Sequence, residues 1–400
     1  MALSGGRVTL PVELLQRRRS AERYDALVVG AGIPGLVCAC LLAGAGLRVL
    51  VVDRRRRPGG ALQTRSYQGY AVDLAPPLFD SPAFDQILAA AGVREHGLRA
   101  GPGRRLRVAI SGEHGLESAP RVPPVPGTVT SPSTLDAVRE LFGVPPRVFA
   151  TLGSVYEDLA AVGAEQLDEW RGRDLETWLA AGSLEPAVRS ALLRGVAMLG
   201  ADVPERASLA ALALRVREPS QIALAVPGDQ PVAGVRGIVQ ALVDRLIDAG
   251  GELKLGTRAV GMAIDARRFT ALAVQREEQP FAEEIAADRC VLCTAAEALP
   301  WVLPEEPLRA LAGPDGIEPR VLLGAAFALE EEAAFADAEE AWVVRVLPSG
   351  RGGAARPSSG ESATFLRASA AAPRIAPPGR GLVLAWSRID AGAARDARIV

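Results

Sequence analysis

The sequence predicts an α/β fold built on a doubly wound parallel sheet. Residues 26–30 (ALVVG) form a short β-branched run, and residues 47–53 (LRVLVVD) form a second one that ends in an acid. Between them, residues 33–46 (IPGLVCACLLAGAG) have helical composition and end on glycine, as helices often do. A later stretch, 236–250, carries its apolar residues on one helical face and stops at glycine. Strand, glycine turn, helix and strand in this order make a βαβ unit.

The composition excludes some classes of function. The chain has 400 residues with 45 basic and 47 acidic side chains, so its net charge of -2 produces no field that would attract nucleic acid. Four cysteines are too few for a disulfide scaffold in a chain of this length, which predicts a reducing, cytoplasmic location. Residues 1–23 contain no long apolar core, and we expect them to be a flexible leader rather than a signal peptide.

The uncharged stretch at 26–47 is long enough to suggest a membrane span, but its pattern favours another structure. It contains Gly30, Gly32, Gly35, Gly44, Gly46 and Pro34. It also changes from a strand-like to a helix-like pattern part-way along, which a continuous membrane helix does not do. We therefore expect a βαβ unit here and not a transmembrane helix.

Three glycines follow the first strand with the spacing G-x-G-x-x-G. Gly30 would allow the tight turn, Gly32 would let the backbone approach a pyrophosphate, and Gly35 would let the helix pack closely on its strand. The N-terminus of that helix points amide donors and its positive dipole end at the phosphates. Asp53, at the end of the second strand, can accept hydrogen bonds from a ribose. This pattern predicts a Rossmann-like domain that binds FAD or NAD(P).

The residues after Asp53 leave the choice of dinucleotide open. Arg54 to Arg57 are either a solvated basic loop or a clamp for the 2′-phosphate of NADP. A third interpretation rests on the glycine pair Gly59 and Gly60, which follows shortly after Asp53. In this interpretation the pair forms a second loop whose backbone approaches a phosphate of the dinucleotide.

Residues 53–64 (DRRRRPGGALQT) resemble the second signature of flavoproteins in the amine oxidase and phytoene desaturase superfamily. In that signature an acid is followed by a basic stretch, a glycine pair and a Thr or Ser. The matching residues are Asp53, Arg55, Gly59, Gly60 and Thr64. Ala61 stands where the family usually has an arginine that touches the FAD phosphates. The resemblance extends over roughly residues 24 to 385 and implies non-covalently bound FAD.

The resemblance also implies two contacts further along the chain. Val260 occupies the position whose backbone usually meets the adenine, and Thr294 lies in the turn where the chain leaves the FAD domain. No catalytic residue is predicted. The predicted cofactor-binding residues are Gly30, Ala31, Gly32, Ile33, Pro34, Gly35, Asp53, Arg54, Arg55, Gly59, Gly60, Ala61, Val260 and Thr294.

The predicted domains interrupt one another along the chain. Residues 24–110 and 225–300 are expected to form a discontinuous FAD-binding domain. Residues 111–224 and 301–400 are expected to form an inserted α+β substrate domain, with a low-complexity loop at 349–363.

The cysteines do not indicate a metal site. Cys290 and Cys293 form C-x-x-C within an apolar strand, and Cys38 and Cys40 point to different sides of a helix. A metal needs convergent ligands, so we expect four small buried side chains and no metal.

The resemblance implies an FAD-dependent oxidoreductase of the phytoene desaturase-like type, with hydride transfer from an apolar small-molecule substrate to the flavin. Two alternatives stay open: a flavoprotein-derived non-catalytic or partner-dependent subunit of a complex, and an NADP-binding oxidoreductase.

Two further expectations concern partners. The family's C-terminal Gly-Asp motif is not found after the return helix, since Gly228–Asp229 precedes it. We therefore expect weak FAD binding by this chain alone and a protein partner that completes the flavin site. Apolar substrates usually arrive from lipid, which predicts loose peripheral membrane contact.

Overall fold

The computed structural model divides into two compact units, which we describe separately. Unit 1 contains Met1–Thr64, Ala83–Gly97 and Gly234–Glu318, and unit 2 contains Arg65–Pro82, Leu98–Ala233 and Pro319–Val400. The residues that the structure describes are 17–75, 78–94, 106–112, 115–118, 139, 143–198, 204–217, 222–224, 235–265, 268–277, 279–305, 320–330, 343–348, 363–371 and 375–390.

Unit 1 is built on a six-stranded sheet with the order β10-β11-β12-β1-β2-β9. Its elements are β1 (Arg17–Val29), α1 (Ile33–Gly44), β2 (Val49–Asp53), most of α2 (Ser81–Ala90), α9 (Val235–Asp248), β9 (Glu252–Leu255), β10 (Thr257–Asp265), β11 (Arg268–Arg276), β12 (Ala282–Leu292) and the 3-10 helix η3 (Ala296–Trp301). Strands β12, β1, β2 and β9 run parallel, which confirms the predicted α/β class with a Rossmann-like parallel sheet. Strands β10 and β11 add an antiparallel extension that the sequence pattern did not predict.

The parallel strands are apolar because both of their faces are covered. Leu27, Val28, Leu50 and Val51 in β1 and β2 are all fully buried. In register, Val28 lies opposite Val51 of β2 and Val291 of β12. Continuous β-branched and leucine-rich runs are typical of strands in this environment.

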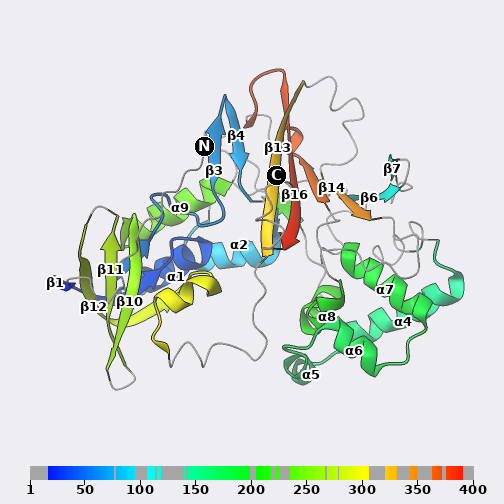
Figure 1. Cartoon of the computed structure of the whole chain (residues 1–400), viewed down its shortest axis with the longest axis horizontal. Coiled ribbons are helices and arrows are strands. Elements are labelled where there is room, and N and C mark those ends of the chain that lie inside the picture. The colour runs from blue at the N-terminus through cyan, green and yellow to red at the C-terminus, as the bar shows by residue number, and fades with distance from the viewer. Residues whose placement is uncertain are drawn as a thin grey trace, which may run out of the picture. The chain divides into compact units, whose positions relative to one another are not determined.

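Helices α1 and α9 pack against each other, as Figure 1 shows. The Cys40 thiol of α1 donates to the Leu242 carbonyl oxygen of α9 at 3.2 Å. Helix α9 follows the predicted helix at 236–250 closely, and its buried face consists of Val235, Ile238, Val239, Leu242 and Leu246. This face is the apolar stripe that the sequence periodicity predicts.

Unit 2 combines a group of helices with a second six-stranded sheet (Figure 1). The helices are α4 (Pro146–Ala161), α5 (Ala164–Glu169), α6 (Leu175–Ala181), α7 (Pro186–Met198), the 3-10 helix η2 (Pro204–Arg206), α8 (Leu209–Arg217) and α12 (Ala368–Ala371). The strands are β3 (Thr64–Tyr67), whose first residue belongs to unit 1, β4 (Tyr70–Asp73), β5 (Leu78–Asp80), β6 (Leu106–Gly112), β7 (Gly115–Ser118), β8 (Ile222–Leu224), β13 (Arg320–Glu330), β14 (Val343–Pro348), β15 (Ala363–Arg367) and β16 (Arg380–Asp390).

The two parts of unit 2 have separate cores. Helices α4 to α8 enclose one apolar cluster, in which Leu152, Leu175, Leu192 and Leu209 are fully buried. The sheet has the order β13-β16-β15-β14-β6-β7, and one face of β16 packs Leu382, Leu384 and Trp386 into a smaller cluster.

The predicted leader needs a correction. Strand β1 begins at Arg17, and residues 17–19 and 23 pair with β12, with a register shift between Arg19 and Arg23. Polar residues continue this strand because their side chains find partners beside it: Arg23 bonds to Asp288 at 2.5 Å, and Arg18 lies over the ring of Phe281. Residues 1–16 and 349–362, which include most of the predicted loop, lie outside the described residues.

The boundaries of the two units also differ from those of the predicted domains. Strand β4 lies in unit 2 and not with the glycine motif, although residues 24–110 were predicted to form one segment. Unit 1 takes in residues as far as Glu318.

Across the described ranges, no helix is both long enough and apolar enough to span a bilayer. Helix α1, which forms the centre of the uncharged stretch, ends after 12 residues.

Two leucines of α8 test how the helical part of unit 2 is held together. Leu212 is 5% exposed and Leu214 is 41% exposed. We expect Leu212→Ala to lower the free energy of unfolding by about 2–5 kcal/mol, because it leaves a cavity in the core. Leu214→Ala, the matched control, should change it by less than about 0.5 kcal/mol. Urea denaturation followed by circular dichroism measures both, and equal losses would contradict the assigned helix face.

Candidate dinucleotide site

The glycine motif lies where three parallel strands end. The Gly30 N–H donates to the Val52 carbonyl oxygen at 2.8 Å, and the Cys293 N–H donates to the Val29 carbonyl oxygen at 2.8 Å. These bonds hold the ends of β1, β2 and β12 together. Gly30 has φ +111°, and a Cβ there would overlap the Cys293 carbonyl oxygen, so no other residue fits.

Helix α1 comes close to β1 at Gly35. A Cβ on Gly35 would overlap the carbonyl oxygen of Gly30, so the helix can hold this position only if the side chain is a hydrogen. This agrees with the role that the spacing predicts for the third glycine.

The glycine pair after Asp53 packs on the first glycine loop. The Gly59 N–H donates to the Ala31 carbonyl oxygen at 2.7 Å, and Gly32 and Gly59 form an isolated parallel bridge. A Cβ on Gly60 would lie 3.1 Å from the Gly32 Cα. The two motifs, more than twenty residues apart in sequence, therefore form one glycine-lined surface.

Asp53 joins these two loops through its carboxylate. Oδ2 accepts the Ala31 N–H at 2.7 Å, and Oδ1 accepts the Arg55 N–H at 2.7 Å. The sequence predicted a ribose as the partner of Asp53, and the structure adds these two backbone bonds. Each carboxylate oxygen has a further lone pair, so a ribose hydroxyl can still donate to it.

The four arginines after Asp53 do not act alike. The Arg55 guanidinium donates to the Gly60 carbonyl oxygen and so closes the second loop. Arg56 pairs with Glu277 at 3.1 Å. Arg54 and Arg57 are exposed and form no ion pair within the part of the chain that the structure describes.

The N-terminus of α1 is suited to an anion. Gly32 is the N-cap, Ile33 and Pro34 begin the first turn, and the first turn contains no acidic residue. No side chain caps this end, so the N–H groups of the first turn can donate to an anion.

The remaining predicted residues lie at different distances from this surface. Thr294 is half-buried and follows Cys293, whose carbonyl oxygen packs on Gly30. Ala61 is exposed in the turn after Gly60. Val260 is buried against Ala273 and Ala282.

Val260 also interrupts the pairing of its own strand. The β10–β11 register passes from Ala259 to Gly261, so Val260 is the extra residue of a bulge and opposes no residue of β11. The backbone N–H and C=O groups of Val260 are therefore not paired with β11, and the predicted contact with adenine requires such unpaired backbone groups.

Two backbone groups of the site were not predicted. The Cys293 carbonyl oxygen packs on Gly30, and the Gly256 N–H donates to the Arg55 carbonyl oxygen at 3.0 Å. Cys293 could have been found from the sequence, because β12 is a parallel strand that ends at the same sheet edge as β1.

The thiols near the glycine loop are not activated. Burial raises the pKa of Cys290 to about 12, and it also raises the pKa of Cys293 and of Cys38. These thiols therefore stay protonated at neutral pH. No group of metal-ligating residues was found among the described parts of the chain.

Comparison with known proteins identifies this unit. Residues 28–91 match the family described as NAD(P)-binding Rossmann-like domain. The chain carries an NAD(P)-binding Rossmann-like domain. The chain is 49% identical over 76 residues to hydroxyneurosporene desaturase of Rubrivivax gelatinosus. That match covers 18% of this chain and 14% of the desaturase, so it shows a relationship over this short stretch alone.

Solved structures extend the similarity to the fold of most of the chain. An oxidoreductase from Methanosarcina mazei aligns with a TM-score of 0.64 and 13% identity over 94% of this chain and 82% of its own. Putrescine oxidase bound to putrescine aligns with a TM-score of 0.57 and 16% identity over 94% and 79%. The predicted relationship to the FAD-dependent amine oxidase and phytoene desaturase-like superfamily is confirmed.

Gly35 tests the close approach of α1 to β1. Gly35→Ala should lower the free energy of unfolding by about 3 kcal/mol, the upper end of overpacking costs, because the new methyl group meets a backbone oxygen. Gly153→Ala in α4 is the control, since a Cβ there meets nothing within 4 Å and should stabilise the helix by about 0.5–1 kcal/mol. Thermal and urea denaturation measure both, and a tolerated Gly35→Ala would refute the packing described.

Proposed function

We propose that this chain is an FAD-dependent oxidoreductase of the phytoene desaturase-like type, acting on a largely apolar substrate. The observation that carries the proposal is the packing of the second glycine loop on the first, in which Gly59 bonds to Ala31 and Gly60 lies against Gly32. A single glycine loop serves any dinucleotide, but a second loop that packs on the first supports the flavoprotein signature read from residues 53–64.

The residues present fit the ADP half of FAD. The free N-terminus of α1 and the surface without Cβ atoms at Gly32 and Gly60 would accept a pyrophosphate. Asp53, fixed by its two backbone bonds, would accept a ribose hydroxyl. Val260, at its bulge, would contact the adenine, and Thr294 would lie near the phosphates.

The protein would supply positioning rather than acid–base chemistry. When bound, FAD accepts a hydride from a C–H bond of the substrate. The buried thiols stay protonated, and the described part of the site presents no histidine, so proton transfer has no evident donor there. We assign the chain's own residues the roles of binding and orienting, and name no catalytic residue.

An apolar sheet face in unit 2 supports an apolar substrate. Phe327 of β13 lies opposite Val383 of β16, and Phe365 of β15 lies opposite Ala385. Phe365, Val383 and Ala385 are partly exposed on this face, and Phe327 is 47% exposed. The name of the related desaturase points to the same substrate class.

NADP is the second candidate, because Arg54 and Arg57 have no acidic partner among the described residues. Two features count against it. Asp53 precedes Arg54 directly and would repel a 2′-phosphate, and Arg55 is already bonded to Gly60.

One titration distinguishes FAD from NADP as the cofactor. We expect the purified full chain to bind FAD more tightly than NADPH, as measured by isothermal calorimetry and by flavin release on denaturation. The double variant Arg54→Ala/Arg57→Ala should leave FAD affinity within about twofold, which is about 0.4 kcal/mol. NADPH binding that these substitutions abolish, with no affinity for FAD, would replace the first candidate by the second.

Asp53 tests the site itself. Asp53→Ala removes the acceptor of two backbone N–H groups and of the expected ribose bond, so we expect FAD affinity to fall by about 1–3 kcal/mol. Asp265→Ala, at the exposed end of β10, is the matched control and should not change affinity. If both variants bind FAD as the unaltered chain does, the cofactor lies elsewhere.

A further inference from the structure

Among the described strands, β13 lies at a sheet edge and lacks the features that usually protect an edge. It runs for 11 residues in an unbroken antiparallel register with β16, and no other described strand pairs with it. Residues 321–329 contain no charge and no proline, and the register contains no bulge. Protected edges are short, charged, bulged or covered, and the opposite edge of the same sheet, β7, is only four residues long.

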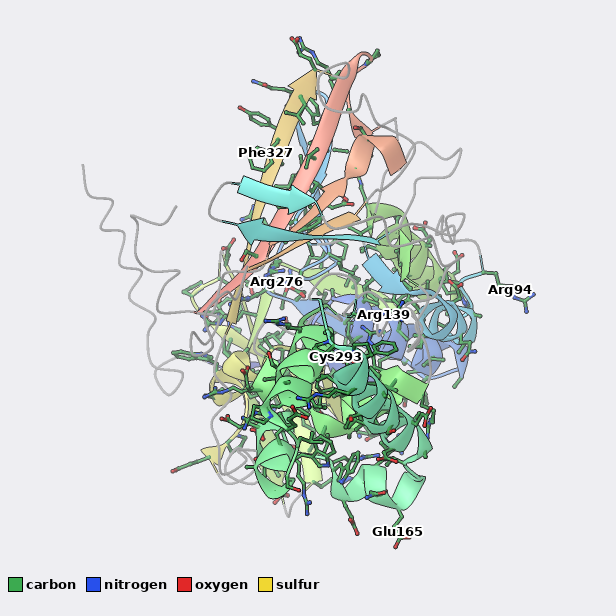
Figure 2. All side chains as sticks on the ribbon, turned by 90° about the vertical axis from the view of Figure 1, so that its right-hand side faces the viewer. Arg94, Arg139, Glu165, Arg276, Cys293 and Phe327 are labelled. Atoms are coloured by element: carbon green, nitrogen blue, oxygen red, sulfur yellow. The ribbon has the colours of Figure 1, made fainter. Side chains whose placement is uncertain are left out.

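The middle of β13 is both apolar and exposed. Residues 324–328 (GAAFA) are all exposed, and Phe327 is 47% exposed. Figure 2 shows the Phe327 side chain beside its strand, projecting away from the ribbon. Small residues on both sides of this strand would let another backbone approach it closely.

The two ends of β13 carry residues of opposite charge, and the Glu330 carboxylate pairs with Arg380 of the neighbouring strand β16 at 3.0 Å. The strand begins with Arg320 and ends with Glu330. If two copies pair antiparallel over their full length, Ala325 lies on the two-fold axis, and Arg320 of each copy opposes Glu330 of the other. In the same register, Phe327 opposes Leu323 of the second copy, an aromatic–aliphatic pair of the kind that stabilises sheets.

We propose that β13 is the pairing edge of a symmetric dimer, in which two copies of this chain join their unit 2 sheets antiparallel across Ala325. The interface is isologous, so each copy contributes the same strand. The backbone N–H and C=O groups along the free edge supply the hydrogen bonds, and the uncharged run at 321–329 favours the antiparallel, fully overlapped register, in which apolar residues oppose apolar residues. This inference does not depend on the cofactor.

Ala325 allows a test with opposite charges. The Ala325→Lys and Ala325→Glu variants each place two like charges side by side on the axis, and each should weaken self-association at least about tenfold. An equimolar mixture of the two should form a heterodimer, because the axis then holds one charge of each sign. Sedimentation velocity on the full chain measures all three samples, and circular dichroism checks that each variant is folded.

Three results would overturn the proposal. They are an unaltered chain that stays a 41.8 kDa monomer up to high micromolar concentration, an Ala325→Lys variant that still dimerises, and a mixture that stays monomeric.

Cysteine cross-linking tests the register independently. Paired Cα atoms of antiparallel strands lie about 4.5–5.5 Å apart, which suits a disulfide. Ala325→Cys should therefore cross-link two copies when copper phenanthroline is the oxidant. Ala328→Cys is the matched control, since its two copies would lie about 20 Å apart in this register. The unaltered chain gives the background from its four cysteines. Equal cross-linking of both variants would reject the register.

Discussion

The carboxylate of Asp53 bonds to the backbone of both loops that form the dinucleotide site, and their positions depend on it. Ala31 belongs to the first glycine loop and Arg55 to the stretch that leads into the second. With both loops held from one side chain at the end of β2, Gly32 and Gly60 come to face each other. A carboxylate that accepts two backbone N–H bonds is an unusually firm anchor, because charge-assisted bonds are about twice as strong as neutral ones.

The glycines allow the strands, the helix and the two loops to approach one another closely around Asp53. Any side chain at Gly30 or Gly35 would push β12 or α1 away from the end of β1, and the helix N-terminus would then move away from the second glycine loop. The positions of the sheet, of α1 and of the glycine loop therefore depend on one another where β1 ends. Unit 1 positions its binding groups with backbone atoms, which explains why so few polar side chains are needed there.

The sequence predicts the parts of this arrangement that are encoded locally. The spacing of Gly30, Gly32 and Gly35, the acid at the end of β2 and the period of α9 each follow from neighbours within a few residues. The strand at Arg17 to Arg23 was missed because its pairing partner, β12, lies more than 250 residues away in the sequence.

The details of the site were less predictable for the same reason. That Gly59 bonds to Ala31, and that Gly256 bonds to Arg55, are consequences of tertiary packing that no local pattern reports. The antiparallel direction of β10 and β11 was not predicted, since the pattern of residues within a strand does not reveal the direction of its neighbour.

Amide hydrogen exchange measures the central claim most directly, namely that the two glycine loops together hold the pyrophosphate of a dinucleotide. Peptides that cover residues 30–36 and 53–60 should exchange more slowly when FAD is added, and also when ADP alone is added. The core helix α4 should not change in either case. Protection that appears only outside these two loops, or no protection at saturating FAD, would contradict the account.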